Sequence, residues 1–375
     1  MALAPITSIM TVSLWKDVVM GIGVLAFTLA IWRLSETNSR DRPINRRVLG
    51  FAIIAGLAVW LSRHNGFPIV LAPMFTLLLL RPAARRITGI ALVVIVGAAL
   101  LVRGPLLSVS NATPSPVASI AYVQRISAHL EAGTELEPDE IEFLEQYRSV
   151  EEYWPYNCAT VQVSWANSFA IPLYDYASDE AELRSLWLRL AARNPSAELD
   201  HIACSSQILW DPFDNGSYTY FLDGSTATGH ADVIRATRTL DLAIEAHPNR
   251  DLARRLFDTF TELPAPLIRP AIPTALLFAA ALAAAGRRRS WTPLLIASPA
   301  VAQTLTLIPF SLVQDTRFQY GTVLVATVAT PFLIAAALFP KRWVSLEEPE
   351  PADSERGDAA DEGRELLEAK QPADT

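Results

Sequence analysis

The chain has 375 residues, of which 51% are hydrophobic and 19% are charged, and its mean hydropathy is +0.25. This composition is unusual for a soluble protein and indicates a lipid environment. The formal net charge of −8 equals the charge of residues 344–375 alone, which hold eleven acidic and three basic residues. We therefore expect 344–375 to be a disordered acidic cytoplasmic tail, and we expect no nucleic-acid partner.

Apolar runs of nearly membrane-spanning length recur along the chain, since about 20 helical residues cross a ~30 Å hydrocarbon core. They lie near 18–34, 48–62, 66–80, 87–103, 267–285, 291–312 and 320–339. The second and third are short, and each is expected to gain a turn from its polar flank. The alternative, a soluble protein, would need seven all-apolar helices in one core. We predict a mainly α polytopic membrane protein with about seven transmembrane helices.

Basic residues between the spans give an orientation. If the spans alternate, all four clusters fall on one side of the membrane, which the positive-inside rule assigns to the cytoplasm. The clusters are Arg33, Arg40, Arg42, Arg46 and Arg47; Arg81, Arg85 and Arg86; Arg287, Arg288 and Arg289; and Lys341 and Arg342. Tryptophans at the span boundaries fit an aromatic belt. We expect a multi-pass protein of the cell membrane with its N-terminus outside and its C-terminal tail in the cytoplasm.

Residues 1–15 do not explain this orientation. They contain no basic segment and no cleavage-like site, so they are not a signal peptide. Either helices that normally precede this segment are missing from the sequence, or the first span is oriented by its own arginines.

The expected domains are transmembrane helices 1–4 over 1–103, an extracytoplasmic domain over 104–265, transmembrane helices 5–7 over 266–343, and the tail. Apolar spacing in the extracytoplasmic domain predicts helices over 117–130, from Pro138, and over 180–193, 197–209 and 252–263. Residues 210–225 read as turns with one short aromatic strand. The domain is therefore expected to be mostly helical.

The two cysteines, Cys158 and Cys204, both fall in the extracytoplasmic domain. In an oxidising compartment they could form a disulfide, or they could be two small buried residues. The spacing of Cys, His and acidic residues fits no metal motif, so no metal site and no cofactor are evident.

Three polar clusters are expected at the outer membrane surface. Their members are Lys16 and Asp17; Arg63, His64 and Asn65; and Asp315, Arg317 and Tyr320. Ionisable groups at membrane depth are costly and often functional, whereas at the interface long side chains commonly snorkel and cap helices. An arginine fork binds phosphate well. We therefore predict that Arg63 and Arg317 converge on the phosphate of a membrane lipid.

Several segments resemble bacterial polytopic membrane proteins related to the C-type (GT-C) glycosyltransferases. They are "WKDV", "SRHNGFPIVL", "DTRFQY", "YWPYNC" and "HIACSSQILW", and the resemblance covers about residues 12–340. It implies a polyprenyl-phosphate sugar as donor and other membrane-embedded envelope proteins as partners. It also implies that Arg63, His64, Asn65, Asp315, Arg317 and Tyr320 contact the donor phosphate or the acceptor.

The resemblance does not extend to the catalytic acid. In that superfamily the acid lies in a first external loop, which should precede "WKDV" and is absent from this sequence. The general base therefore stays unknown, with Asp17 and Asp315 better explained as partners of Lys16 and Arg317. We expect a glycosyltransferase-like protein that is either the C-terminal part of such an enzyme or a relative without activity alone. The complete enzyme leaves room for a divalent metal. A non-enzymatic envelope protein and a lipid or solute transporter are the alternatives.

Overall fold

The computed structural model describes residues 16–36, 45–63, 65–109, 117–150, 154, 156–159, 179–213, 269–311, 314 and 316–339. Within these ranges the chain is helical and contains no strand. The expected tail over 344–375, the predicted helix over 252–263 and most of the predicted strand region lie outside the described residues.

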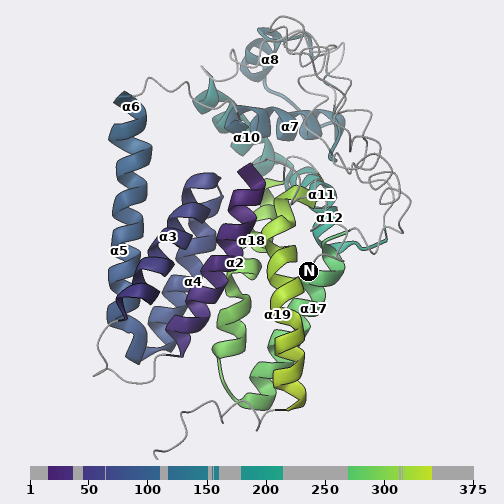
Figure 1. The fold of residues 1–375 in the computed structure, drawn as a ribbon. Coiled ribbons are helices and arrows are strands. Elements are labelled where there is room, and N and C mark those ends of the chain that lie inside the picture. The colour runs from purple at the N-terminus through teal and green to yellow at the C-terminus, as the bar shows by residue number, and fades with distance from the viewer. Residues whose placement is uncertain are drawn as a thin grey trace, which may run out of the picture.

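Most of the described chain forms a bundle of long helices that run nearly side by side (Figure 1). Its members are α2 (Lys16–Ser35), α3 (Arg46–Ser62), α4 (Gly66–Leu80), α5 (Arg85–Leu101), α17 (Ala271–Arg288), α18 (Thr292–Phe310) and α19 (Tyr320–Leu338). A short 3₁₀ turn, η1 (Pro82–Ala84), joins α4 to α5. Beyond α5 the helix continues through a π-helical turn, η2 (Val102–Leu106), into α6 (Leu107–Val109). The two halves of the chain interleave, because α2 packs on both α3 and α19.

A helix occupies each of the seven ranges in which an apolar span is expected. Four helices are long and apolar enough to cross a membrane: Asp17–Ser35, Pro82–Leu106, Thr292–Phe310 and Tyr320–Leu338. Among the others, Gly66–Leu80 is apolar but shorter, and α3 and α17 carry arginines in an end turn. The count of seven transmembrane helices therefore stays a prediction.

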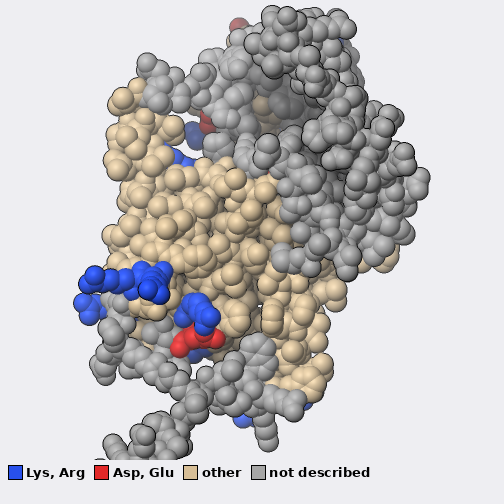
Figure 2. All heavy atoms as spheres, in the orientation of Figure 1, with Lys and Arg blue, Asp and Glu red and all other residues tan. Residues whose placement is uncertain are grey.

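The outer surface of the bundle is apolar, as expected for contact with lipid. Ile54, Leu79 and Val93 are each at least 70% exposed, and the middle of the visible face carries no charged atoms (Figure 2). Soluble proteins rarely expose apolar patches of this extent. Together with the four long apolar helices, this surface supports a location in a membrane.

A second group of helices lies across one end of the bundle (Figure 1); we call these the cap helices. They are α7 (Val117–Glu131), α8 (Pro138–Glu145), α10 (Glu180–Arg193), α11 (Pro195–Ser205) and α12 (Gln207–Trp210). Pro138 occupies the first turn of α8 as predicted, and Glu137 and Glu140 form a reciprocal capping box there. The predicted helix over 197–209 is interrupted at Ser206 and forms α11 and α12 instead.

Long polar side chains fix the cap helices onto the bundle. Arg125 of α7, only 7% exposed, donates a hydrogen bond to the carbonyl of Pro309 near the end of α18. The last carbonyls of a helix have no donor within the helix, so a side chain must supply one. Arg269 likewise donates to the carbonyl of Asp211, just after α12, at 2.6 Å. These bonds set where the cap helices lie over the bundle.

Candidate functional site

Asp17, Arg63 and Tyr320, three of the polar residues predicted at one membrane surface, lie at the end of the bundle that faces the cap helices, which we call the cap end. Asp17 stands in the first turn of α2 and Arg63 directly follows α3. Both Nε and Nη2 of Arg63 contact the same oxygen, Oδ1, of Asp17. The side chain of Asp17 is 2% exposed and that of Arg63 is 13% exposed. This is a nearly buried ion pair that joins α2 to α3.

The second oxygen of Asp17 is unusual. Oδ2 is buried and has no hydrogen-bond partner in the structure. A buried carboxylate oxygen without a donor is costly, and such atoms are commonly satisfied by water or by a bound group. The cap end therefore retains unused acceptor capacity beside Arg63.

Arg63 also contacts the segment that precedes α19. Its guanidinium carbon lies 4.2 Å from the ring centre of Phe318, which belongs to the 3₁₀ turn η4 (Thr316–Gln319). Arg317 is the neighbouring residue in that turn. Asp315 and the side chain of Arg317 lie outside the described residues, and the convergence of the two guanidinium groups stays a prediction.

The remaining predicted residues are placed differently. Tyr320 is 1% exposed, and a Cβ added to Gly21 would lie 2.4 Å from its ring, so Tyr320 packs tightly between α19 and α2. Asn65 precedes α4 but makes no capping hydrogen bond with its side chain. His64 and the side chain of Lys16 lie outside the described residues.

Arg103 is a member of this site that the sequence reading missed. It lies in η2, and its Nη2 donates to the carbonyls of Trp60 at 2.7 Å and Arg63 at 2.9 Å. It thus closes the gap between the ends of α3 and α5. The signal available in the sequence was its position near the end of an apolar run; the structure adds that it lies within a π-helical turn, a feature frequent at functional sites. Figure 2 shows basic and acidic atoms inside a recess beside the upper end of α5.

Two arginines meet at the turn that follows α3. The guanidinium of Arg63 pairs with Asp17, and the guanidinium of Arg103 donates to the backbone carbonyl of Arg63. Among the described residues of this site, the charged groups that make these contacts are thus two guanidinium groups and one carboxylate.

A different polar cluster holds the cap helices together. Glu198 of α11 pairs with Arg125 and accepts a hydrogen bond from Nε1 of Trp187 at 2.9 Å. Tyr156 and Nδ1 of His201 lie 3.0 Å apart nearby. Burial lowers the pKa of His201 to about 4 and raises the pKa of Tyr156 to about 12. Both groups are therefore uncharged near neutral pH, as in a packed interface.

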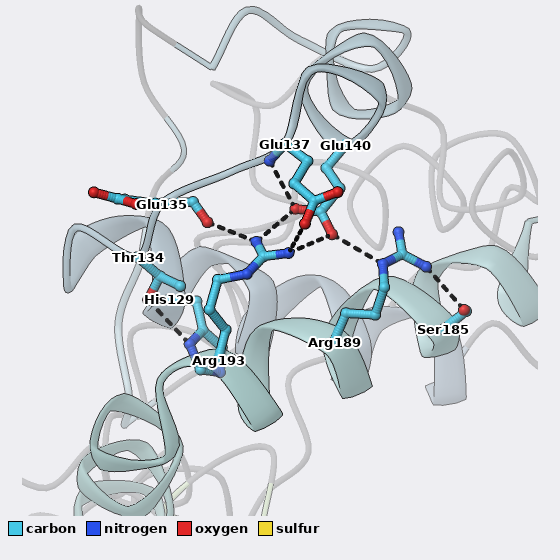
Figure 3. A network of polar contacts seen from close by, with 8 residues as sticks. All are labelled: His129, Thr134, Glu135, Glu137, Glu140, Ser185, Arg189 and Arg193. Atoms are coloured by element: carbon cyan, nitrogen blue, oxygen red, sulfur yellow. Dashed lines mark hydrogen bonds and ion pairs between the residues drawn. The ribbon is translucent and has the colours of Figure 1, made fainter.

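A third network joins α8 to α10 (Figure 3). The carboxylate of Glu140, 1% exposed, accepts hydrogen bonds from Arg189 at 2.9 Å and from Arg193 at 2.8 Å. Burial alone would raise the pKa of Glu140, but the hydrogen bonds from Arg193, the Glu137 backbone and Arg189 hold it at about 2. The carboxylate is thus ionised and fully engaged, which assigns it a structural role.

The two cysteines form a disulfide in the structure, with a Cα–Cα distance of 5.7 Å. Gln314 contacts both sides of the disulfide. Its backbone N–H donates to the carbonyl of Ala159 at 2.8 Å, and its Nε2 donates to the carbonyl of Cys204 at 2.6 Å. Gln314 precedes η4 by two residues in the chain. The disulfide is therefore connected through Gln314 to the turn whose Phe318 contacts Arg63.

Over the described ranges, no group of three or more His, Cys, Asp or Glu is placed to hold a metal ion. The described residues define a mainly helical protein with four helices long and apolar enough to cross a membrane, and with an arginine-containing polar site at one end of its bundle. No protein-family model, curated protein or solved structure shows a significant match to the chain. Its function must therefore be argued from the site itself.

Proposed function

We propose that the protein is an integral membrane protein that binds the phosphate of a membrane lipid at the cap end of its bundle. The observation that carries the proposal is the meeting of two arginines at a single turn: Arg63, which pairs with Asp17, and Arg103, which donates to the carbonyl of Arg63. Arginine binds phosphate with charge-assisted, often paired hydrogen bonds. The site lies where the apolar helices end, which is the depth of a lipid headgroup.

The lipid proposed is a polyprenyl phosphate carrying a sugar, and the activity is that of a GT-C-like glycosyltransferase on the outer face of the membrane. The resemblance of "WKDV", "SRHNGFPIVL" and "DTRFQY" supports this choice. Arg63 of the second segment contacts Asp17 of the first and Phe318 of the third. With the catalytic acid unassigned, the proposal concerns donor binding, and transfer needs a general base from elsewhere.

The proposal also includes the orientation. Arg33, Arg47, Arg85 and Arg288 lie at helix ends that face away from the cap helices. By the positive-inside rule this end is cytoplasmic and the cap helices are extracytoplasmic.

A lipid-binding experiment tests the proposal. The full chain in detergent micelles is titrated with a polyprenyl phosphate and, in parallel, with the corresponding polyprenol. We expect the phosphate to bind and the alcohol to bind much more weakly. Arg103→Gln should weaken binding by roughly tenfold, because a charge-assisted hydrogen bond contributes about 1.5–3 kcal/mol. Arg33→Gln at the opposite end is the matched control and should bind like the parent.

Two outcomes would refute the proposal. One is equal affinity for the polyprenyl phosphate and the polyprenol. The other is unchanged binding of the polyprenyl phosphate in the double variant Arg103→Gln, Arg317→Gln. In either case the cap-end arginines serve only to cap helices and to carry the ion pair.

A further inference from the structure

A separate groove lies on the bundle between α17 and α18. It has a volume of about 340 Å³, and its walls are formed mainly by Phe278, Ala281, Leu282, Leu294, Ala297 and Val301. Ser298, the one hydroxyl-bearing residue of this lining, donates its hydroxyl to the carbonyl of Leu295 at 2.7 Å. The groove therefore presents hydrocarbon to any occupant.

The groove opens on the apolar outer surface of the bundle. Leu282 on its rim is 63% exposed, whereas Ala281 behind it is fully buried. The α18 helix that forms one wall is long and apolar enough to cross a membrane. An occupant would thus enter from the hydrocarbon region of a bilayer.

One end of the groove leads to three consecutive arginines. Helix α17 ends at Arg288, and Arg289 caps it in the left-handed conformation with φ 49°. Arg289 follows Leu282 by seven residues, or about two helical turns, so its Cα lies on the groove side roughly 10 Å further along. Arg287 follows Phe278 by nine residues, or about two and a half turns, and lies on the opposite side.

The hairpin of α17 and α18 carries positive charge and no carboxylate side chain, because residues 269–311 contain no Asp or Glu. Trp291, 57% exposed, stands beside the arginines, as aromatic residues do at the membrane–water interface. Arg81 from the end of α4 donates to Thr292 and Ser290. That contact fixes the start of α18 against α4, so the basic end and the groove keep their relative position.

We propose that this groove binds an acyl chain of an anionic phospholipid whose phosphate lies on the basic end of α17, with Arg289 as the principal contact. Apolar grooves that end in basic residues match the two parts of such a lipid, and basic pockets between membrane helices bind anionic headgroups. Arginines that attracted anionic lipids only through nonspecific surface electrostatics would do so whether or not the groove is open. The site lies at the opposite end of the bundle from Arg63 and does not depend on the function proposed above.

Thermal unfolding and native mass spectrometry of the full chain in micelles test the proposal. Phosphatidylglycerol, phosphatidylcholine with the same acyl chains, and inorganic phosphate are added in parallel. We expect phosphatidylglycerol to be retained and to raise the unfolding temperature, with phosphatidylcholine binding at least tenfold more weakly and inorganic phosphate having no effect. Equal effects of the two lipids, or full stabilisation by inorganic phosphate, would overturn the proposal.

Matched variants locate the site. Arg289→Asn, in which asparagine tolerates the left-handed conformation, should weaken phosphatidylglycerol binding by roughly tenfold. Arg287→Gln removes the same charge from the opposite side and should bind like the parent. Ser298→Phe fills the groove and should displace the lipid while leaving the arginines in place. Equal losses in Arg289→Asn and Arg287→Gln, or unchanged binding in Ser298→Phe, would refute a groove-bound lipid.

Discussion

Arg63 and Asp17 are separated by 46 residues in the chain and form a nearly buried ion pair that ties the end of α3 to the start of α2. The pair uses one oxygen of the carboxylate and leaves Oδ2 without a hydrogen-bond partner. Breaking a buried pair from one side is costly because the remaining charge stays desolvated. This pair is therefore both a constraint on the bundle and a sensitive point for mutation.

Asp17→Asn removes the negative charge with little change in shape. We expect a loss of about 3–5 kcal/mol of stability, since the nearly buried guanidinium of Arg63 then loses its ion pair with Asp17. The double variant Asp17→Asn, Arg63→Gln should lose less than the sum of the two single variants, and a thermal-unfolding double-mutant cycle measures the coupling. Additive losses would show that the pair does not interact energetically.

Gly66 is required where α3 turns into α4. A Cβ at this position would lie 2.2 Å from the carbonyl oxygen of Val59, and backbone cannot move aside as a flexible side chain can. Gly66→Ala should therefore cost about 1–3 kcal/mol, as overpacking does. Gly89→Ala in α5, where nothing lies within 4 Å, is the control and should be neutral or stabilising by up to ~1 kcal/mol. Equal unfolding temperatures for the two variants would contradict the close approach.

Glu140 makes the cap helices sensitive to acid. Its folded-state pKa of about 2 lies below the ordinary value of 4.5, so its contribution is complete above about pH 4.5 and declines as the pH falls toward 2. The Glu140→Gln variant should lose about 1.5–3 kcal/mol of its free energy of unfolding at neutral pH. Its stability should also fall less than that of the parent as the pH is lowered from about 4.5 toward 2. Glu142→Gln, an exposed neighbour on α8, should leave the profile unchanged; a parallel shift in both variants would argue against the network.

The disulfide is expected to stabilise the segment that carries Phe318. The intact mass should be about two daltons below that of the reduced chain, with no thiol titrating in denaturant. The pair Cys158→Ser, Cys204→Ser should cost about 2–4 kcal/mol and increase hydrogen exchange in residues 314–319, because Gln314 binds the carbonyls of Ala159 and Cys204. Gln314→Ala should increase exchange there with the disulfide intact. Unchanged hydrogen exchange in both variants would show that neither the disulfide nor Gln314 stabilises residues 314–319.

Cysteine labelling of sealed cells tests the orientation. A probe at Ser196 in α11 should react with an impermeant reagent added from outside, and a probe at Gly286 in α17 should not, because the arginines beside Gly286 are expected in the cytoplasm. Both positions are exposed, so access is decided by side of the membrane. The reverse labelling pattern would invert the proposed topology.

The sequence alone located most of the described helices. Long apolar runs can satisfy their backbone only as helices when they lie in lipid, so the ranges of α2, α4, α18 and α19 follow from composition. In the cap, Pro138 and the apolar spacing of 180–193 predicted α8 and α10, because local capping and periodicity depend on near neighbours. The break at Ser206 was missed, since the apolar spacing of α11 continues into α12.

The site is only partly predictable from sequence. Polar residues at the ends of apolar runs indicated Arg63 and Asp17, but both had been assigned other neighbours, Asp17 being expected to pair with Lys16. Which ends meet depends on how helices pack, and that is decided by shape: Gly21 admits the ring of Tyr320, and Gly66 admits the backbone of Val59. The inclusion of Arg103 depends on the π-helical turn η2 and on the reach of its side chain to α3. Contacts between residues distant in the chain have no local signal, so only the tertiary structure could decide them.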